Sequence, residues 1–361
     1  MMNMLRVGIV GCGEVVQIIH LPSLYQLGEK FRVTAVCDVS RTVVDAVGEA
    51  AGVTARYQDY HELVTQDDVD VVLVTNPNAY HTEVTLAAIA AGKHVLVEKP
   101  MCFTLREVEA ISDASQRAGV LVQVGYMRRY APAFVEACRL VKQMGEIRAA
   151  HVRDVIGHNA LIIGQTARVV RGTDIPAHII EEGKARQQAA LRDAIGDASP
   201  ALQLAYGFML GLSTHDLSAM RELLGLPKRV VYAAQRHGIY LTAAFDYGDF
   251  ICTFDTGVDN IPRFDARLEV FGADQVIRVL YDTPYVRHLP TRLVVTSANH
   301  GRGVSHETML PDWCDPFVAE WNAFYDSIQA GTQPKTGPED FGADLELFQA
   351  MIRLLRAQES D

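Results

Sequence analysis

The feature that most constrains this chain is a glycine-rich turn close to its start, Gly8-Ile9-Val10-Gly11-Cys12-Gly13. The apolar residues 5–10 predict a buried β-strand, and the residues from Glu14 and Val15 onward predict the first turn of a helix. At a strand–turn–helix junction of this kind, backbone N–H groups and the positive end of the helix dipole can hold a pyrophosphate. We therefore expect a dinucleotide to bind at Gly8, Gly11, Gly13, Glu14 and Val15.

The second predicted strand, residues 31–37, ends at Asp38. A carboxylate at this place can accept hydrogen bonds from a ribose diol and would repel a 2′-phosphate, so Asp38 favours NAD. This context also favours a cofactor-binding turn over a glycine turn that serves packing alone. Ser40 and Arg41 follow within reach of the same ribose and could instead hold the extra phosphate of NADP. The sequence therefore predicts NAD, with NADP as the alternative.

The first third of the chain alternates short β-branched runs with amphipathic helical stretches, which is typical of βαβ units around a parallel sheet. Strands are predicted at residues 5–10, 31–37, 71–74, 94–97 and 120–124. A helix is predicted at 79–91, and the capping box that begins at Thr104 and includes Glu107 starts another that ends near Gly119. Residues 1–125 are therefore predicted to form a doubly wound Rossmann domain.

After Gly125 the pattern changes. A helix at 132–143 leads into a strand at 147–155, and residues 159–205 are polar and helical in character. Strands then cluster without helices between them, at 229–237, 240–245, 250–254, 266–271 and 276–281, before two closing helices at 316–330 and 338–357. This spacing predicts a C-terminal α+β domain, residues 126–361, with a mostly antiparallel open sheet that binds substrate and mediates oligomerisation.

Composition excludes several classes of partner. The 361 residues include 44 acidic and 33 basic residues, a net charge of -11, and no basic run, so neither nucleic acid nor an anionic membrane surface is an expected partner. No apolar stretch is long enough to span a membrane, and the first strand begins too early for a signal peptide, so we expect a cytoplasmic protein. The six scattered cysteines form no C-x-x-C pair, and no metal site is predicted.

A charged pair follows the fifth predicted strand, in Val97-Glu98-Lys99-Pro100. In open α/β sheets, ligands bind at the carboxyl ends of the strands, so these side chains are candidates for a site. A cis bond before Pro100 would fix the direction of Lys99. The alternative is a surface Glu-Lys pair that simply ends a strand.

Four motifs together resemble the glucose-fructose oxidoreductase, inositol dehydrogenase and MocA family across nearly the whole chain. They are Gly8-x-x-Gly11-x-Gly13, the loop from Thr75 and Asn76 to His81, the run from Ala91 to Pro100, and Val124-Gly125-Tyr126-Met127-Arg128-Arg129-Tyr130. The resemblance implies a nicotinamide enzyme that moves hydride to or from a ring carbon of a cyclic polyol, sugar or sugar derivative. It implies that Lys99 touches both the cofactor and a substrate hydroxyl.

The resemblance also assigns the remaining contacts. It places Thr75, Asn76, Pro77, Asn78, His81, Glu98 and Arg128 at the cofactor, and Tyr126 and Arg129 at the substrate, although one of the two arginines could serve only as a salt bridge between domains. A lysine beside a cationic nicotinamide loses proton affinity through like-charge repulsion and desolvation. Lys99 is therefore expected to act as a general base.

His215 is predicted near the start of a helix that runs to Leu224. The resemblance implies an acid or base histidine here, with an aspartate one helical turn earlier, but this chain has Gly211 at that position. Asp216, Tyr285 or a residue of segment 159–205 could replace the carboxylate. His158 and Asn159, which follow a predicted strand, are further substrate candidates. The alternative for His215 is a capping or packing role.

These inferences predict an NAD(P)-dependent dehydrogenase or reductase that acts on CH-OH groups. One alternative is an enzyme that cleaves glycosides by transient oxidation with bound NAD, and another is a non-catalytic nicotinamide-binding regulator. We also expect the open sheet to leave one apolar face, through which the chain forms a homodimer or homotetramer.

Overall fold

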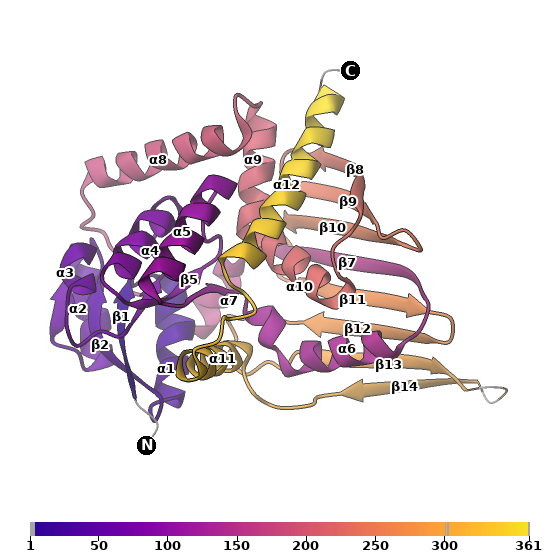
Figure 1. Ribbon diagram of the computed structural model, residues 1–361, viewed down its shortest axis with the longest axis horizontal. Helices are drawn as coiled ribbons and strands as arrows, with labels where there is room; N and C mark the ends of the chain where they lie inside the picture. Colours follow the sequence, from indigo (N-terminus) through magenta and orange to yellow (C-terminus); the bar gives the residue numbers. More distant parts are fainter. Residues whose placement is uncertain (1–3, 300, 302, 360–361) are drawn as a thin grey trace. The chain divides into compact units, whose positions relative to one another are not determined.

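A six-stranded parallel sheet forms the centre of the first part of the computed structural model, which describes residues 4–299, 301 and 303–359 (Figure 1). The strand order is β3-β2-β1-β4-β5-β6. The chain therefore reverses its direction of growth at β1, as in a Rossmann fold. The strands are β1 (Leu5–Val10), β2 (Phe31–Cys37), β3 (Ala55–Tyr57), β4 (Val71–Val74), β5 (His94–Glu98) and β6 (Val122–Gly125).

Helices connect these strands. They are η1 (Val16–His20), α1 (Leu21–Gln26), α2 (Arg41–Ala51), α3 (Tyr60–Val64), η2 (Asn78–Tyr80), α4 (His81–Ala90) and α5 (Leu105–Ala118). The capping box predicted at the start of α5 is confirmed, because the Glu107 amide donates to Thr104 Oγ1 while the Glu107 side chain accepts from the Thr104 amide. The predicted Rossmann fold is likewise confirmed.

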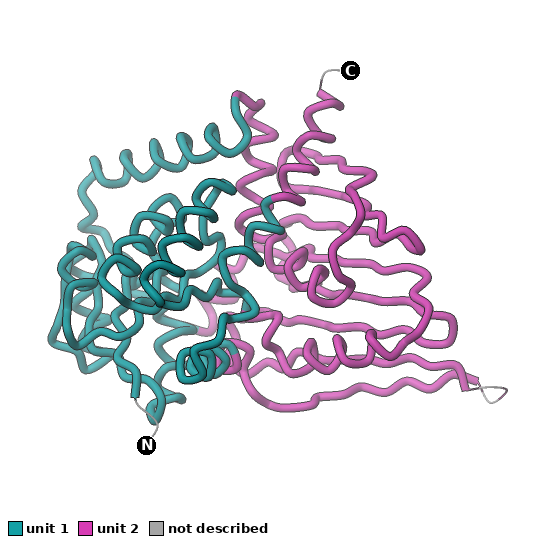
Figure 2. Tube along the Cα trace, viewed as in Figure 1, with its two compact units in different colours: residues 1–126, 167–196, 320–345 teal, residues 127–166, 197–319, 346–361 magenta. Residues whose placement is uncertain are grey.

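The chain divides into two compact units, and neither is continuous in sequence (Figure 2). The first unit combines residues 1–126 with 167–196 and 320–345, and the second combines 127–166 with 197–319 and 346–361. The first boundary lies next to the expected division after residue 125. The two later segments differ from the expected contiguous domains, because both belong to the same compact unit as residues 1–126.

The segment 320–345 completes the core of the first unit. Trp321, Phe324 and Tyr325 of α11 (Pro316–Ala330) belong to the same apolar cluster as strands β1 and β2. The Trp321 ring centroid lies 5.0 Å from that of Phe31, in an edge-to-face arrangement. The predicted bounds of α11 are confirmed, but its packing partner lies almost three hundred residues away and leaves no local sequence pattern.

The second unit contains an eight-stranded sheet in the order β14-β13-β12-β11-β7-β10-β9-β8 (Figure 1). Its strands are β7 (Ile147–Gly157), β8 (Arg229–Arg236), β9 (Tyr240–Asp246), β10 (Ile251–Asp259), β11 (Phe264–Gly272), β12 (Gln275–Tyr281), β13 (Arg292–Ala298) and β14 (Val304–Met309). Among the described strands of this sheet, only β7 and β10 pair in parallel. The mostly antiparallel sheet is thus confirmed, whereas β13 and β14 were not predicted.

The two faces of this sheet differ in chemistry. Helices α6 (Pro132–Gln143) and α10 (Thr214–Leu224) contact the sheet through β12, β13 and β7. Side chains between the buried positions form ion pairs, among them Arg153 with Asp265 at 2.8 Å and Arg267 with Glu269 at 3.2 Å. The expectation of an apolar open face was therefore wrong, because alternation places charged side chains there.

His215 lies within a long helical segment. α9 (Pro200–Phe208) continues into the π-helical turn η4 (Met209–Ser213) and then directly into α10. We expected His215 near the start of a helix. The helical backbone instead continues through Ser213 into Thr214, without a side-chain cap, so His215 lies inside a longer helical segment. Single π-turns are frequent at functional sites.

The remaining helices are α7 (Asn159–Thr166), α8 (Ala177–Ile195), η3 (Met127–Tyr130) and α12 (Pro338–Glu359). Within the described residues, none of the helices has both the length and the apolar character that a membrane span requires. The cysteines are free thiols.

The two tryptophans give a direct test of the core of the first unit. Trp321 is fully buried, whereas Trp313 is 71% exposed. We expect Trp321→Ala to lower the free energy of unfolding by about 3–5 kcal/mol, because it removes buried apolar surface and leaves a cavity. Trp313→Ala, the matched control, should change it by less than about 0.5 kcal/mol. Urea unfolding followed by circular dichroism measures both, and equal effects would contradict the assigned packing.

Candidate active site

The glycine-rich turn is held against the loop that follows β4. Gly11 has a φ of 89°, and a Cβ atom on it would lie 2.3 Å from the backbone nitrogen of Asn76. The Thr75 amide donates to the Val10 carbonyl at 2.9 Å, and the Thr75 hydroxyl donates to the Gly11 carbonyl at 2.6 Å. Only glycine fits this close approach.

Gly13 has a different reason to be glycine. A Cβ atom built on it would meet nothing within 4 Å, so packing within the protein does not require its absence. The side-chain oxygen of Asn76, whose backbone meets Gly11, is buried and accepts no hydrogen bond from the described residues. The open approach to the Gly13 backbone fits a bound pyrophosphate, and the unsatisfied Asn76 acceptor fits a ligand that donates a hydrogen bond. Glu14 and Val15 follow at the start of the helical region.

Asp38 is oriented by two backbone amides. The Cys12 amide donates to its Oδ2 at 2.8 Å, and the Ser40 amide donates to its Oδ1 at 2.9 Å. An ionised carboxylate has about four acceptor positions, so both oxygens can accept further bonds from ribose hydroxyls. Ser40 is the N-cap of α2, and its hydroxyl accepts from the Val43 amide at 3.1 Å. Arg41 is largely exposed.

His81 joins two loops at the same edge of the sheet. Its Nδ1 lies 2.7 Å from the Pro100 carbonyl oxygen, and its Nε2 lies 2.7 Å from the Asn76 carbonyl oxygen. Burial lowers the pKa of His81, although the two carbonyl contacts and the Glu98 carboxylate oppose this shift. The ring thereby fixes the spacing between the loop after β4 and the cis Lys99–Pro100 bond after β5.

A hydrogen-bonded chain orients Glu98 beside Lys99. Trp321 Nε1 donates to His20 Nδ1 at 3.1 Å, so the ring proton of neutral His20 is on Nε2, which donates to Glu98 Oε1 at 2.9 Å. Burial alone would raise the pKa of Glu98, but the His20 hydrogen bond and the Lys99 charge hold this pKa below its usual value. Glu98 is therefore an oriented carboxylate directly before Lys99.

In the second unit, Arg128 is the centre of a buried charge cluster with Asp154 on β7 and Asp216 on α10. Its Nη1 lies 2.5 Å from Asp216 Oδ1 and 3.1 Å from Asp154 Oδ2. The guanidinium also lies over the rings of Tyr281 and Phe264, at 5.1 and 5.5 Å from their centroids. Burial would lower the pKa of Arg128, but the two carboxylates keep it above its usual value.

The two carboxyl groups of this cluster share one cation. Burial and the charge of Asp154 raise the pKa of Asp216 well above its ordinary value, and Arg128 only partly opposes this. Asp154 Oδ1 and Asp216 Oδ2 accept no hydrogen bond from the described residues. A proton held by Asp216 and donated to Asp154 would satisfy both oxygens and leave the cluster neutral.

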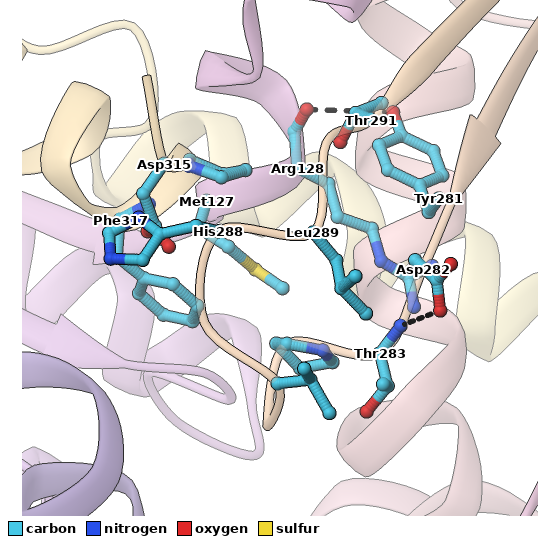
Figure 3. A pocket seen from close by; sticks show the side chains of 13 residues that line it. Met127, Arg128, Tyr281, Asp282, Thr283, His288, Leu289, Thr291, Asp315 and Phe317 are labelled. Carbon is cyan, nitrogen blue, oxygen red and sulfur yellow. Dashed lines mark hydrogen bonds between the residues drawn. The ribbon is translucent and has the colours of Figure 1, made fainter. Parts of the chain in front are cut away.

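A small cavity of about 30 Å³ lies beside the cluster (Figure 3). Arg128 and Tyr281 line it together with the loop that includes Thr283 and Leu289, and Met127 and Phe317 complete the wall. This volume is that of one or two water molecules. The cavity can therefore hydrate the cluster but is too small for a sugar ring.

Other predicted substrate residues lie in varied surroundings. The Tyr126 hydroxyl donates to Asp344 at 2.6 Å in the core of the first unit. Arg129 pairs with Glu222 at 2.6 Å within the second unit. His158 is exposed and lines an open hollow, and the side-chain oxygen of Asn159 is buried and accepts no hydrogen bond from the described residues. Their substrate roles stay predictions.

Lys99 directly follows β5 in the first unit, and His215 is buried in α10 of the second. A Cβ atom on Gly211 would meet nothing within 4 Å, so the backbone leaves room for a side chain there. Sequence reasoning missed Asp154, His20 and Trp321, whose roles come from contacts between distant segments. No group of three or more His, Cys, Asp or Glu side chains in the described part of the chain is arranged to hold a metal ion.

Comparison with known proteins places this geometry in context. Residues 5–126 match an oxidoreductase family with an NAD-binding Rossmann fold. The myo-inositol 2-dehydrogenase of Thermotoga maritima is 25% identical over 369 residues, covering 99% of this chain and 98% of that protein. The inositol 2-dehydrogenase of Salmonella paratyphi B is 36% identical over 145 residues, but this alignment covers only 40% of this chain and 43% of that protein. The crystal structure of an aldose-aldose oxidoreductase from Caulobacter crescentus has the same fold, with a TM-score of 0.75, 21% identity and coverage of 99% and 98%.

The buried cluster generates a pH-dependent prediction. The raised pKa of Asp216 contributes stability below the unfolded-state value of about 3.9, and this contribution is lost as pH rises through the folded-state pKa. Asp216→Asn removes the titration and keeps the Arg128–Asp154 pair. We expect the variant to stay within about 1 kcal/mol of wild type at low pH and to gain relative stability as pH rises.

Guanidinium unfolding at several pH values measures this effect, with the exposed Asp249→Asn as control. A loss of more than about 3 kcal/mol in Asp216→Asn at neutral pH would show that Asp216 is an essential ionised partner instead.

Proposed function

We propose that the chain belongs to the glucose-fructose oxidoreductase, inositol dehydrogenase and MocA family, and that it transfers hydride between NAD and a CH–OH carbon of a cyclic polyol, sugar or sugar derivative. One observation carries the proposal. Cys37, Val10, Val74 and Val97 are register partners across four parallel strands. The residues that follow them, Asp38, Gly11, Thr75 and Glu98, therefore share the carboxyl edge where such folds bind ligands.

The cofactor residues follow from this edge. Gly11 and Gly13 leave the backbone accessible to a pyrophosphate, Asp38 accepts hydrogen bonds from ribose hydroxyls, and the loop from Thr75 to Asn78 borders the same region. His81 and Glu98 position this loop and Lys99. When bound, the nicotinamide supplies the hydride acceptor.

Lys99 is proposed to take the proton of the substrate hydroxyl as the hydride leaves the same carbon. A cationic nicotinamide lowers proton affinity at a nearby lysine, which suits a general base. The Lys99 amine must be neutral to accept this proton, so the cationic nicotinamide has to outweigh the attraction of the Glu98 carboxylate directly before it.

His215 is proposed as the second proton-handling residue. Asp216 is held by Arg128, so we assign it to positioning the turn of α10 that carries His215 rather than to replacing the carboxylate missing at Gly211. His158, Asn159, Tyr126 and Arg129 remain proposed substrate contacts.

The substrate class is proposed from the relatives, because inositol 2-dehydrogenases act on a cyclic polyol. The test is a screen of cyclic polyols, aldoses and keto-sugars with NAD and NADP separately, read by the absorbance of the reduced nicotinamide. Turnover of at least one substrate supports the proposal. Cofactor binding without net reduction, accompanied by cleavage of a glycoside, would support the transient-oxidation alternative, and binding without any reaction would support the regulator.

Loss of either proton-handling residue should affect turnover more than binding. We expect Lys99→Met and His215→Asn each to lower kcat by about 10² to 10⁴ while the dissociation constant for NAD changes little. If they form one relay, the double variant should be little worse than either single variant. Steady-state kinetics and calorimetry measure these effects, with Lys93→Met and the exposed His61→Asn as controls. A His215→Asn enzyme within a few-fold of wild type would show that this histidine is structural.

We further propose that the chain forms a homodimer or homotetramer through the charged open face of the eight-stranded sheet. Charged side chains of both signs, such as Arg153 and Asp265, are partly exposed there and can pair with opposite charges on a second copy. Light scattering should report a multiple of 39.8 kDa. Reversing the charge in Arg153→Glu should shift the mass toward the monomer, and a mass of 39.8 kDa for wild type at all micromolar concentrations would refute the proposal.

A further inference from the structure

A ten-residue segment, residues 167–176, returns from the second unit to the cofactor-binding edge of the first, and we call it the strap. The amide of Gln17, one turn after the glycine-rich turn, pairs with the backbone of Val170. Gln17 Nε2 donates to the Val170 carbonyl at 2.9 Å, and the Val170 amide donates to Gln17 Oε1 at 2.8 Å. Arg171 pairs with Glu14 at 2.6 Å. One end of the strap is therefore fastened beside the predicted pyrophosphate site.

The other end of the strap reaches the start of α2. The Ser40 hydroxyl donates to Asp174 Oδ1, and the Thr42 amide donates to Asp174 Oδ2 at 3.1 Å. These two hydrogen bonds hold the pKa of Asp174 below its usual value. An ionised carboxylate from a distant segment thus occupies the N-terminus of α2, where amide donors and the helix dipole favour an anion.

Gly172 allows this close approach. A Cβ atom on Gly172 would lie 2.6 Å from Ser40 Oγ and 2.7 Å from Ser40 Cβ. Any other residue would push the strap away from α2. This contact is independent of the Asp174 hydrogen bonds and places the strap at the same point.

We infer that Asp174 is a specificity-determining residue that excludes NADP. The inference rests on the NAD-binding part of the proposed function. In a Rossmann fold the carboxylate after the second strand, here Asp38, faces the ribose 2′-hydroxyl, so a 2′-phosphate would come to lie between this strand and the start of α2. The groups it would need are the Ser40 hydroxyl, the Thr42 amide and Arg41.

Asp174 already uses two of these three groups and adds a negative charge. A phosphate would have to displace it from both hydrogen bonds and would be repelled by both Asp38 and Asp174. From the sequence alone, Ser40 and Arg41 could hold the 2′-phosphate of NADP. Asp174, more than one hundred and thirty positions away, therefore prevents the phosphate from binding there.

Two variants remove the obstacle in different ways. Asp174→Asn deletes the charge but keeps an acceptor for Thr42 and a donor for Ser40. Gly172→Val keeps every charge but forces the strap away from Ser40. Helix α8 stays anchored in both, because Arg186 pairs with Glu83 and Arg106 pairs with Asp193. Glu181→Gln, on the exposed surface of α8, is the matched control for loss of one negative charge.

The readout is the dissociation constant of NAD and of NADP for the full chain, measured by calorimetry without substrate. We expect Asp174→Asn to tighten NADP binding by about tenfold or more, with NAD changed by less than about threefold. This gain should shrink at high salt, because the interaction is exposed and screened. Gly172→Val should also tighten NADP binding.

The controls separate the possible failures. Unchanged NADP binding in both variants, with NAD binding intact, would overturn the role of Asp174 and leave the proposed function standing. An equal gain in Glu181→Gln would overturn it as well, by showing a general effect of net charge. Failure of wild type to bind either cofactor would overturn both the inference and the proposed function.

Discussion

The contact between Gly11 and the backbone of Asn76 is the constraint on which the cofactor edge depends. A side chain at Gly11 would overlap the Asn76 nitrogen, so the turn after β1 and the loop after β4 can approach only if Gly11 has no Cβ atom. This approach lets the Thr75 hydroxyl bond to the turn and brings the Asn76 carbonyl to His81. Because His81 also contacts the Pro100 carbonyl, the position of the Lys99 loop follows from a glycine almost ninety residues earlier.

The strands and helices of the Rossmann domain could be predicted because their determinants are local. Buried β-branched runs, the capping box at Thr104 and glycine at the helix ends are all visible in sequence. β14 was missed for a physical reason: it is exposed along nearly its whole length at the edge of the sheet, so Val304 to Met309 show no alternation of apolar and polar residues. The discontinuous units were missed because Trp321 and Gln17 contact partners that no sequence window includes.

Some residues of the candidate site could likewise be located from the sequence, and others could not. Gly11, Gly13, Asp38 and Lys99 follow strands and could be located from the sequence, since the carboxyl ends of parallel strands meet at one edge. The partners that hold the charged residues of the site in place could not be located in this way. Glu98 depends on His20 and Trp321, and Arg128 depends on carboxylates from a strand and a helix. The π-turn before His215 likewise could not be predicted, because no distinctive residue type marks it. It places His215 in the interior of a helical segment and not at a helix end.

The placement of α11 in the core of the first unit has a consequence for synthesis of the chain on the ribosome. Domains usually complete folding in order as they emerge, the N-terminal one first. Here the cluster around Phe31 and Leu24 lacks Trp321, Phe324 and Tyr325 until nine-tenths of the chain has been translated. The nascent Rossmann sheet therefore exposes apolar surface while most of the second unit is being made, which is the state in which nascent chains bind chaperones.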